Sequence, residues 1–113
     1  MDKLTTYRKL IKRLLSELSD LSNRCPTPGV ESVCAFDEER DQYLLLTVGW
    51  HGNRRASGTT LHLRIRGGKI WVEEDWTEDG IANALLRAGV PNDDIVLAFQ
   101  APDMRKFTQF ATP

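Results

Sequence analysis

The chain has 113 residues, of which 41% are hydrophobic and 27% charged, and its formal net charge is −1. This length predicts a single domain over residues 1–113, and the balance is typical of a globular protein with one hydrophobic core. The near-zero charge argues against strong non-specific binding to nucleic acid. No secretory signal pattern opens the chain and no apolar run is long enough to span a bilayer, so we expect a cytoplasmic protein.

The cysteine and histidine pattern gives no support for a metal site. Cys25 and Cys34 lack the spacing and the companions of a zinc site, and His51 and His62 are not near them in the sequence. In a reducing cytoplasm both thiols are expected to be free, as small buried or half-buried side chains. We expect no cofactor and no bound metal.

Apolar residues spaced by three and four predict an amphipathic helix over residues 3–22, with Asp2 as its N-cap. The apolar positions are Leu4, Tyr7, Ile11, Leu14, Leu15, Leu18 and Leu21. The opposite face carries a group of cations that includes Lys9, Lys12 and Arg13. Such a face is usually solvated, although it could also serve binding.

A proline-rich loop over residues 23–29 is expected to lead into four strands. Residues 30–37 alternate between apolar and polar side chains, and residues 42–50 are almost continuously apolar, which predicts a central strand covered on both faces. The third strand is expected within residues 54–66 and the fourth over residues 69–75.

Gly67 and Gly68 form a two-residue turn signal between the third and fourth strands and so predict their register. The predicted pairs are Ile65 with Ile70 and Leu63 with Val72 on the core face, and Arg64 with Trp71 and His62 with Glu73 on the outer face. Apolar pairs then share one face and polar pairs the other. Arg64 is expected to lie over the Trp71 ring in a cation–π contact.

A second helix is expected over residues 78–88, with Thr77 as its N-cap and Gly89 as its stop. The run Ile95–Phe99 is a short fifth strand or a helical turn, and the strand is the preferred interpretation. Pro102 opens an irregular tail. The elements together predict an α+β fold: an N-terminal helix, an antiparallel sheet of four or five strands, a second helix and the tail.

Two arrangements of residues raise the question of catalysis. Grouped carboxylates can hold a hard cation, as in metal-dependent nucleases. The carboxylates concerned are Glu73, Glu74, Asp75, Glu78 and Asp79. Helix capping and solvation explain this cluster better. His62 opposite Glu73 could form a general base, but no nucleophile at a defined position accompanies the pair. We therefore expect a protein that is not an enzyme.

Exposed basic and aromatic residues are better candidates for function, because tryptophan and arginine are enriched in the hot spots of protein interfaces. The candidate partner-binding residues are Trp50, Arg54, Arg55, Trp76, Arg105 and Lys106. The alternative is that the arginines are solvated and the tryptophans belong to the core, and for the tryptophans the core is the preferred interpretation. Direct DNA binding would instead use phosphate contacts. Its candidate residues are Lys9, Lys12, Arg13 and Arg55.

Collinear matches along nearly the whole chain resemble the XisI family. They comprise Asp2-Lys3-Leu4, Tyr7, Asp37, Glu39-Arg40-Asp41, Val48-Gly49-Trp50, Arg54-Arg55, Leu61-His62-Leu63, Gly68-Lys69-Ile70-Trp71, Thr77-Glu78, Gly80-Ile81-Ala82, Gly89-Val90-Pro91, Asp94-Ile95-Val96-Leu97, Phe99, Pro102, Arg105, Thr108 and Phe110-Ala111. Any one of these matches is weak, but their order and density are specific.

The resemblance implies an XisI-like fold and a factor that controls site-specific excision of the fdxN element during heterocyst differentiation in cyanobacteria. It implies DNA recombination carried out by a separate recombinase, and protein–protein contacts with a nuclease-like companion called XisH. It supplies no catalytic residues. Direct DNA binding, and after it a metal-dependent nuclease that uses Glu73, Asp75 or Glu78, are the alternative functions.

Overall fold

The computed structural model describes residues 2–24 and 28–113. The expectation for Cys25, and residues 25–27 of the predicted proline loop, lie outside the described residues. The elements, in chain order, are α1 (Lys3–Arg24), β1 (Val30–Asp37), β2 (Gln42–His51), β3 (Arg54–Arg66), β4 (Lys69–Asp75), α2 (Ile81–Arg87), the 3-10 turn η1 (Asn92–Asp94), β5 (Ile95–Leu97) and the 3-10 turn η2 (Pro102–Phe107). The predicted α+β fold is confirmed.

The strands form one sheet in the order β1-β2-β3-β4-β5. The strands β1 to β4 pair with one another antiparallel, as expected. The segment Ile95–Leu97 is a strand, which confirms the preferred interpretation, but it pairs with β4 in parallel. The sheet is therefore mixed, because the chain crosses over through α2 between β4 and β5 and returns in the same direction.

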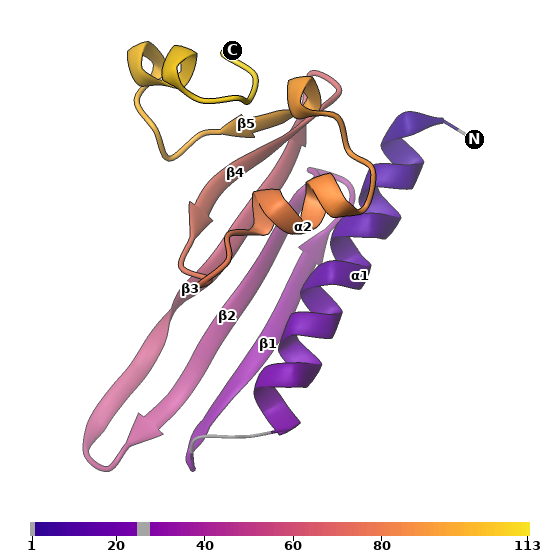
Figure 1. The fold of residues 1–113 in the computed structure, drawn as a ribbon. Helices are drawn as coiled ribbons and strands as arrows, with labels where there is room; N and C mark the ends of the chain where they lie inside the picture. The colour runs from indigo at the N-terminus through magenta and orange to yellow at the C-terminus, as the bar shows by residue number, and fades with distance from the viewer. Residues whose placement is uncertain (1, 25–27) are drawn as a thin grey trace.

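Both α-helices lie on the same face of the sheet, and the core fills the space between them and the strands (Figure 1). The residues that are fully buried there include Ile11, Leu15, Tyr43, Leu61, Leu63, Ile70, Val72, Leu85 and Ile95. The prediction that β2 is covered on both faces is wrong, since Leu44, Leu46 and Val48 stay partly exposed on the other face. The apolar run of β2 thus supplies one buried face and one open apolar face.

The helix α1 begins as predicted and continues two residues further. The Asp2 carboxylate accepts a hydrogen bond from the Thr5 N–H at 2.9 Å, which confirms Asp2 as the cap. Tyr7, Ile11 and Leu15 are buried against the sheet. Leu21 belongs to the same predicted stripe but is 60% exposed, so the last turn of α1 extends past the core.

The helix α2 begins at Ile81 and is shorter than expected. Thr77 is not its N-cap: its N–H and hydroxyl both donate to the Asp75 carboxylate, at 2.9 and 2.5 Å. Gly80, at φ +80°, turns the chain into the helix, a conformation that side chains disfavour. Glu78 and Asp79 therefore precede the helix and do not form its first turn.

The β3–β4 pairing confirms three of the four predicted pairs. The fourth is wrong, because an irregularity between His62 and Leu63 shifts the register and places His62 opposite Glu74. The predicted contact of Arg64 with Trp71 is also wrong. Arg64 forms an ion pair with Glu73 at 3.7 Å, and the cations over the Trp71 ring are Arg66 and Arg105.

Candidate functional site

The β2–β3 hairpin projects beyond β4 and β5, and β1 runs beside it as far as Gly49 (Figure 1). Near its end Trp50 pairs with Arg55, and His51 pairs with Arg54 next to the turn. The Arg55 guanidinium lies 5.3 Å from the centre of the Trp50 ring, within cation–π range. Trp50 is 51% exposed, so the expectation that it belongs to the core is wrong. We call Trp50, Arg54 and Arg55 the hairpin surface.

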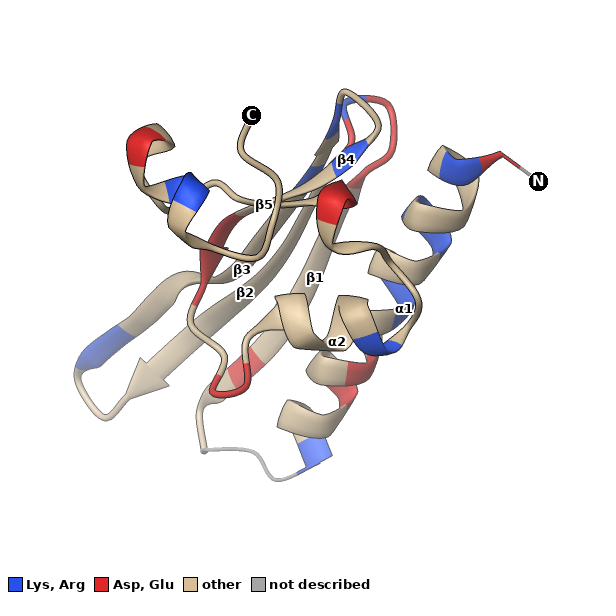
Figure 2. Ribbon diagram, turned by 45° about the horizontal axis from the view of Figure 1, so that its top comes forward, with Lys and Arg blue, Asp and Glu red and all other residues tan. Residues whose placement is uncertain are grey.

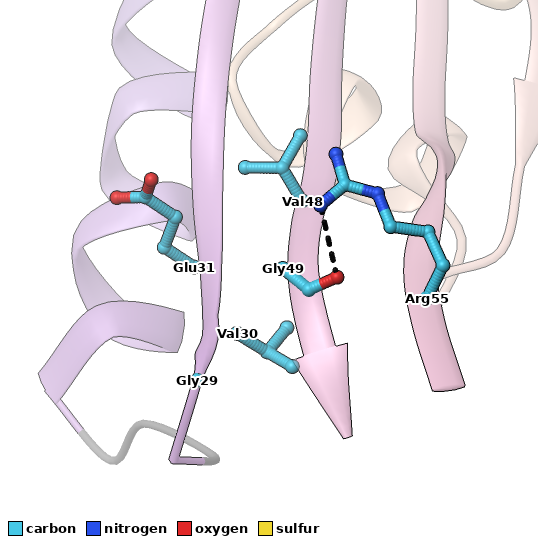
Figure 3. Close-up of a pocket in the computed structure, with 6 residues that line it drawn as sticks. All are labelled: Gly29, Val30, Glu31, Val48, Gly49 and Arg55. Atoms are coloured by element: carbon cyan, nitrogen blue, oxygen red, sulfur yellow. Dashed lines mark hydrogen bonds between the residues drawn. The ribbon is translucent and has the colours of Figure 1, made fainter. Parts of the chain in front are cut away.

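Gly49 holds the base of this surface together. Its φ is +143°, and a Cβ built there would come 2.0 Å from the carbonyl oxygen of Gly29. This close approach lets the Trp50 N–H donate to the Gly29 carbonyl at 2.8 Å. The Arg55 guanidinium in turn donates to the Gly49 carbonyl at 3.3 Å (Figure 3). Backbone contacts thus position the Trp50–Arg55 pair on the strands.

A shallow hollow of about 570 Å³ lies beside this pair, on the open face of the sheet. Its lining residues are Gly29, Val30, Glu31, Val48, Gly49 and Arg55 (Figure 3). The hollow is an open surface depression that combines an apolar side chain, a carboxylate and a guanidinium. It suits a side chain of another protein better than an enclosed small molecule.

The remaining candidate partner-binding residues lie in two other places. Trp76 follows β4, is 76% exposed, and donates from its indole nitrogen to the Glu74 carboxylate at 2.7 Å. It too is not a core residue. Lys106 lies on η2 with its ammonium over the exposed Phe107 ring. The six candidates therefore do not form one continuous surface.

Arg105 is engaged within the chain. It is buried, and its guanidinium donates to the backbone carbonyls of Gln100 and Ala98, at 3.1 and 3.3 Å, and to that of Pro113. It also lies 5.6 Å from the centre of the Trp71 ring. Arg105 thus fastens the C-terminal tail to β4.

The candidate DNA-binding residues lie on two sides of the sheet. Lys12 is paired with Glu38, and Arg13 with Glu17 at 3.7 Å, all near α1 on the helix-covered side. Arg55 lies at the far end of the hairpin, on the open face. In Figure 2 the blue stretches of α1 and of the hairpin are separated by uncharged strands. The four side chains do not form one basic stripe.

The acidic residues proposed for a metal site serve separate contacts. Glu73 pairs with Arg64, and the Asp75 carboxylate accepts hydrogen bonds at the start of α2. Glu78 is exposed in the loop between β4 and α2. Within residues 2–24 and 28–113, no three His, Cys, Asp or Glu side chains come together in a way that could hold a metal ion. The same residues include no helix long and apolar enough to cross a bilayer.

Two part-buried ionic clusters were not predicted from the sequence. The Asp94 carboxylate accepts a hydrogen bond from the Tyr7 hydroxyl at 2.5 Å and pairs with the Lys3 ammonium at 2.9 Å. Burial alone would raise the pKa of Asp94, but these two partners hold it below its ordinary value. Burial and the Asp94 contact also raise the pKa of Tyr7. This cluster ties α1 to η1.

The second cluster joins α1 to the β1–β2 turn. The Arg8 guanidinium donates to both carboxylate oxygens of Asp41, at 2.7 and 3.1 Å, and so lowers the pKa of Asp41. The Tyr43 hydroxyl donates to the same carboxylate at 2.9 Å. Arg8 and Asp41 are 33 positions apart in the chain, and Tyr7 and Asp94 are 87 apart, so no local pattern identifies these contacts. Their closed, fully partnered geometry indicates a structural role.

The molecule is a small α+β protein with surfaces suited to binding. Its mixed sheet is covered by helices on one face, its β2–β3 hairpin exposes a Trp–Arg pair, and the charged groups of its ionic clusters are paired with one another. The chain belongs to the XisI protein family, whose profile matches residues 1–112. A search of curated proteins finds no match.

Two crystal structures of proteins from Anabaena variabilis are similar to this chain. The first is a XisI-like protein with a TM-score of 0.91 and 34% identity, covering 97% of this chain and 99% of its own. The second is the fdxN element excision controlling factor XisI, with a TM-score of 0.85 and 44% identity, covering 99% of this chain and 100% of its own.

Proposed function

We propose that this protein is a controlling factor for site-specific excision of a DNA element of the fdxN type. In this proposal it acts in the cytoplasm, has no catalytic activity of its own, and works through contact with an XisH-like protein beside a separate recombinase. The observation that carries the proposal is the 44% identity, over 99% of this chain, to an excision controlling factor of the same fold.

The hairpin surface is the part of the molecule that best fits a protein contact. Trp50 presents a large exposed ring beside a guanidinium, the pairing of residue types that dominates interface hot spots. The backbone contacts at Gly49 already hold this pair in place, so little conformational freedom is lost on binding. The adjoining hollow can accept a partner side chain.

A complementation experiment tests the function. The gene is introduced into a cyanobacterium that carries an fdxN-type element but lacks its own controlling factor, and excision is measured by amplification across the rejoined ends. We expect excision to be restored. Soluble, folded protein without any rejoined product would refute the proposal. A strain that also lacks the XisH-like protein serves as the control and should show no excision.

Co-purification with an XisH-like protein tests the proposed surface. Trp50→Ala combined with Arg55→Glu removes the ring and reverses the guanidinium charge, and should weaken retention by about 30-fold or more, as for the loss of a hot spot. Lys9→Glu is the matched control, since Lys9 is an exposed cation on α1, on the other side of the sheet. Equal retention of both variants would exclude the hairpin surface as the contact.

A further inference from the structure

One segment of β3 has a free backbone edge. The strand β4 pairs with β3 only from Leu61 onwards, and the Trp76 N–H donates to the Thr60 carbonyl where that pairing ends. From Arg54 to Thr59, β3 is paired with β2 alone. Among the described residues, no other strand lies along this side of the segment.

The direction of its backbone groups follows from the register. The Trp50 N–H donates towards β1, to the Gly29 carbonyl, so Trp50 and its opposite residue Arg55 are a non-hydrogen-bonded pair. The N–H and C=O of Arg55 therefore point away from β2. By the alternation of a strand, those of Ser57 and Thr59 do the same. The segment presents a row of donors and acceptors.

Each of the two outermost strands has an outward-facing backbone position that is already paired. At the β1 edge the Asn23 side chain pairs with both backbone groups of Ser32, at 2.9 and 3.0 Å. At the β5 edge the Ala111 N–H donates to the Ile95 carbonyl at 2.9 Å. Proteins usually block free edges because they pair with other chains. The segment Arg54–Thr59 of β3 has no such backbone partner on its free side among the described residues, so it is a candidate site for pairing.

We propose that the free edge of β3 pairs with the same edge of a second copy of this chain and so forms a two-fold symmetric dimer. Ser57 lies on the axis opposite Ser57 of the other copy, and Arg55 lies opposite Thr59. Like charges do not face each other in this register. Roughly six backbone hydrogen bonds form across the axis. The pairing ends where Arg54 of one copy reaches Thr60 of the other, which is also where β4 begins to occupy the edge.

Charge complementarity favours a second copy over any other occupant. One end of the free edge is basic, at Arg54 and Arg55. The other end adjoins Glu74, near the end of β4, and Glu78 and Asp79, which follow that strand. Figure 2 shows the blue end of the hairpin and the red segments around the end of β4 at opposite ends of this stretch. A two-fold axis through antiparallel edges brings the basic end of each copy to the acidic end of the other, so the dimer contains two such contacts.

The first test removes the edge without disturbing the hairpin. Ser57→Pro deletes an N–H that points away from β2, a position where strands accept proline. Light scattering and sedimentation of the purified full chain, without any other protein, should find a dimer for the natural sequence and a monomer with an unchanged circular dichroism spectrum for Ser57→Pro. A natural protein that stays monomeric at every concentration overturns the proposal. That same result is expected if the edge pairs instead with an acidic strand of another protein. A dimeric Ser57→Pro variant also overturns it.

The second test uses charge and does not depend on proline. The variants Arg54→Glu with Arg55→Glu, and Glu74→Lys with Glu78→Lys, should each weaken the dimer by about tenfold or more. Mixing the two variants should restore a dimer made of one copy of each, because both ends are then complementary again. A mixture that stays monomeric overturns the proposal. Neither test involves the excision partner, so the outcome is independent of the proposed function.

Discussion

The carboxylate of Asp75 accepts a hydrogen bond from the backbone N–H of Ile81 at 2.7 Å, across a loop of five residues. The same carboxylate also holds the N–H and the hydroxyl of Thr77. The last residue of β4 thus satisfies a free donor at the start of α2 and orders the loop between them.

Asp75→Ala should therefore lower the free energy of unfolding by about 1–2 kcal/mol, as for the loss of a helix cap. Thr77→Ala removes only a donor to this carboxylate and should cost less. Urea denaturation of both variants measures the difference. A larger loss for Thr77→Ala would contradict the assignment of the capping role to Asp75.

The ion pair between Arg8 and Asp41 should make stability fall in acid. The pKa of the Asp41 carboxyl is lowered in the folded state, so as the pH falls Asp41 is protonated in the unfolded chain before it is protonated in the folded protein. This contribution is present above the ordinary aspartate pKa of about 3.9 and is lost as the pH falls through the lower folded value. Asp41→Asn removes it, and asparagine tolerates the positive φ of +53° at this position. The stability difference between the natural protein and Asp41→Asn should therefore shrink from neutral pH to about pH 3. An equal difference at both pH values would refute this account.

Tyr7→Phe should lower the free energy of unfolding by about 1–3 kcal/mol, because the part-buried Asp94 carboxylate loses its hydrogen bond from the hydroxyl. Lys3 still pairs with that carboxylate, which limits the loss. Thermal and chemical denaturation measure the change. Lys3→Met is the companion variant. Because the Lys3 side chain is half exposed, this variant should lower the free energy of unfolding by less than Tyr7→Phe does.

Two leucines of one helical stripe should respond differently to truncation. Leu15 is fully buried and Leu21 is 60% exposed. Leu15→Ala should cost about 2–5 kcal/mol through lost burial and the remaining cavity, and Leu21→Ala less than about 0.5 kcal/mol. Chemical denaturation of the two variants checks both values. Similar losses would show that the end of α1 is packed in solution.

Gly49→Ala should separate the start of β1 from β2. A Cβ at residue 49 meets the Gly29 backbone, which cannot move aside as a flexible side chain can. The expected loss is about 1–3 kcal/mol, with faster hydrogen exchange at the Trp50 amide. Gly58→Ala is the control, because the backbone there is not in the left-handed region and a Cβ has open space. Unchanged exchange in Gly49→Ala would contradict the close approach.

Local patterns in the sequence predicted most of the elements because local physics produces them. The bounds of β1 and β4 follow from alternation and turn residues, and the β3–β4 register follows from the Gly67-Gly68 turn as far as Leu63 with Val72. Beyond that pair the expectation is wrong, because β4 holds one extra residue, Glu73, between Val72 and Glu74. The run Glu73-Glu74-Asp75 has no alternation of apolar and polar residues that could have marked the shift.

Contacts between residues that are distant in the chain could not be predicted from the sequence. The predicted Thr77 cap is wrong because a carboxylate from the preceding strand competes for the same donors. Trp50 and Trp76 were expected in the core because of residue type, but Trp50 lies on the face of the sheet that the helices leave open and Trp76 lies in the loop after β4. Whether an apolar strand face is buried depends on how far the helices reach.

The Asn23 side chain that closes the β1 edge has a consequence for how copies can add to one another. A sheet with two open borders, one on each side, can receive a neighbour at each and lengthen without limit into a fibre. The Asn23 amide occupies both backbone groups of Ser32 as a neighbouring strand would, and the Ser19 hydroxyl donates to the same carbonyl at 3.2 Å. Replacing Asn23 by an apolar residue would free the Ser32 N–H, at the point of the β1 border where a further strand would otherwise have to displace this side chain.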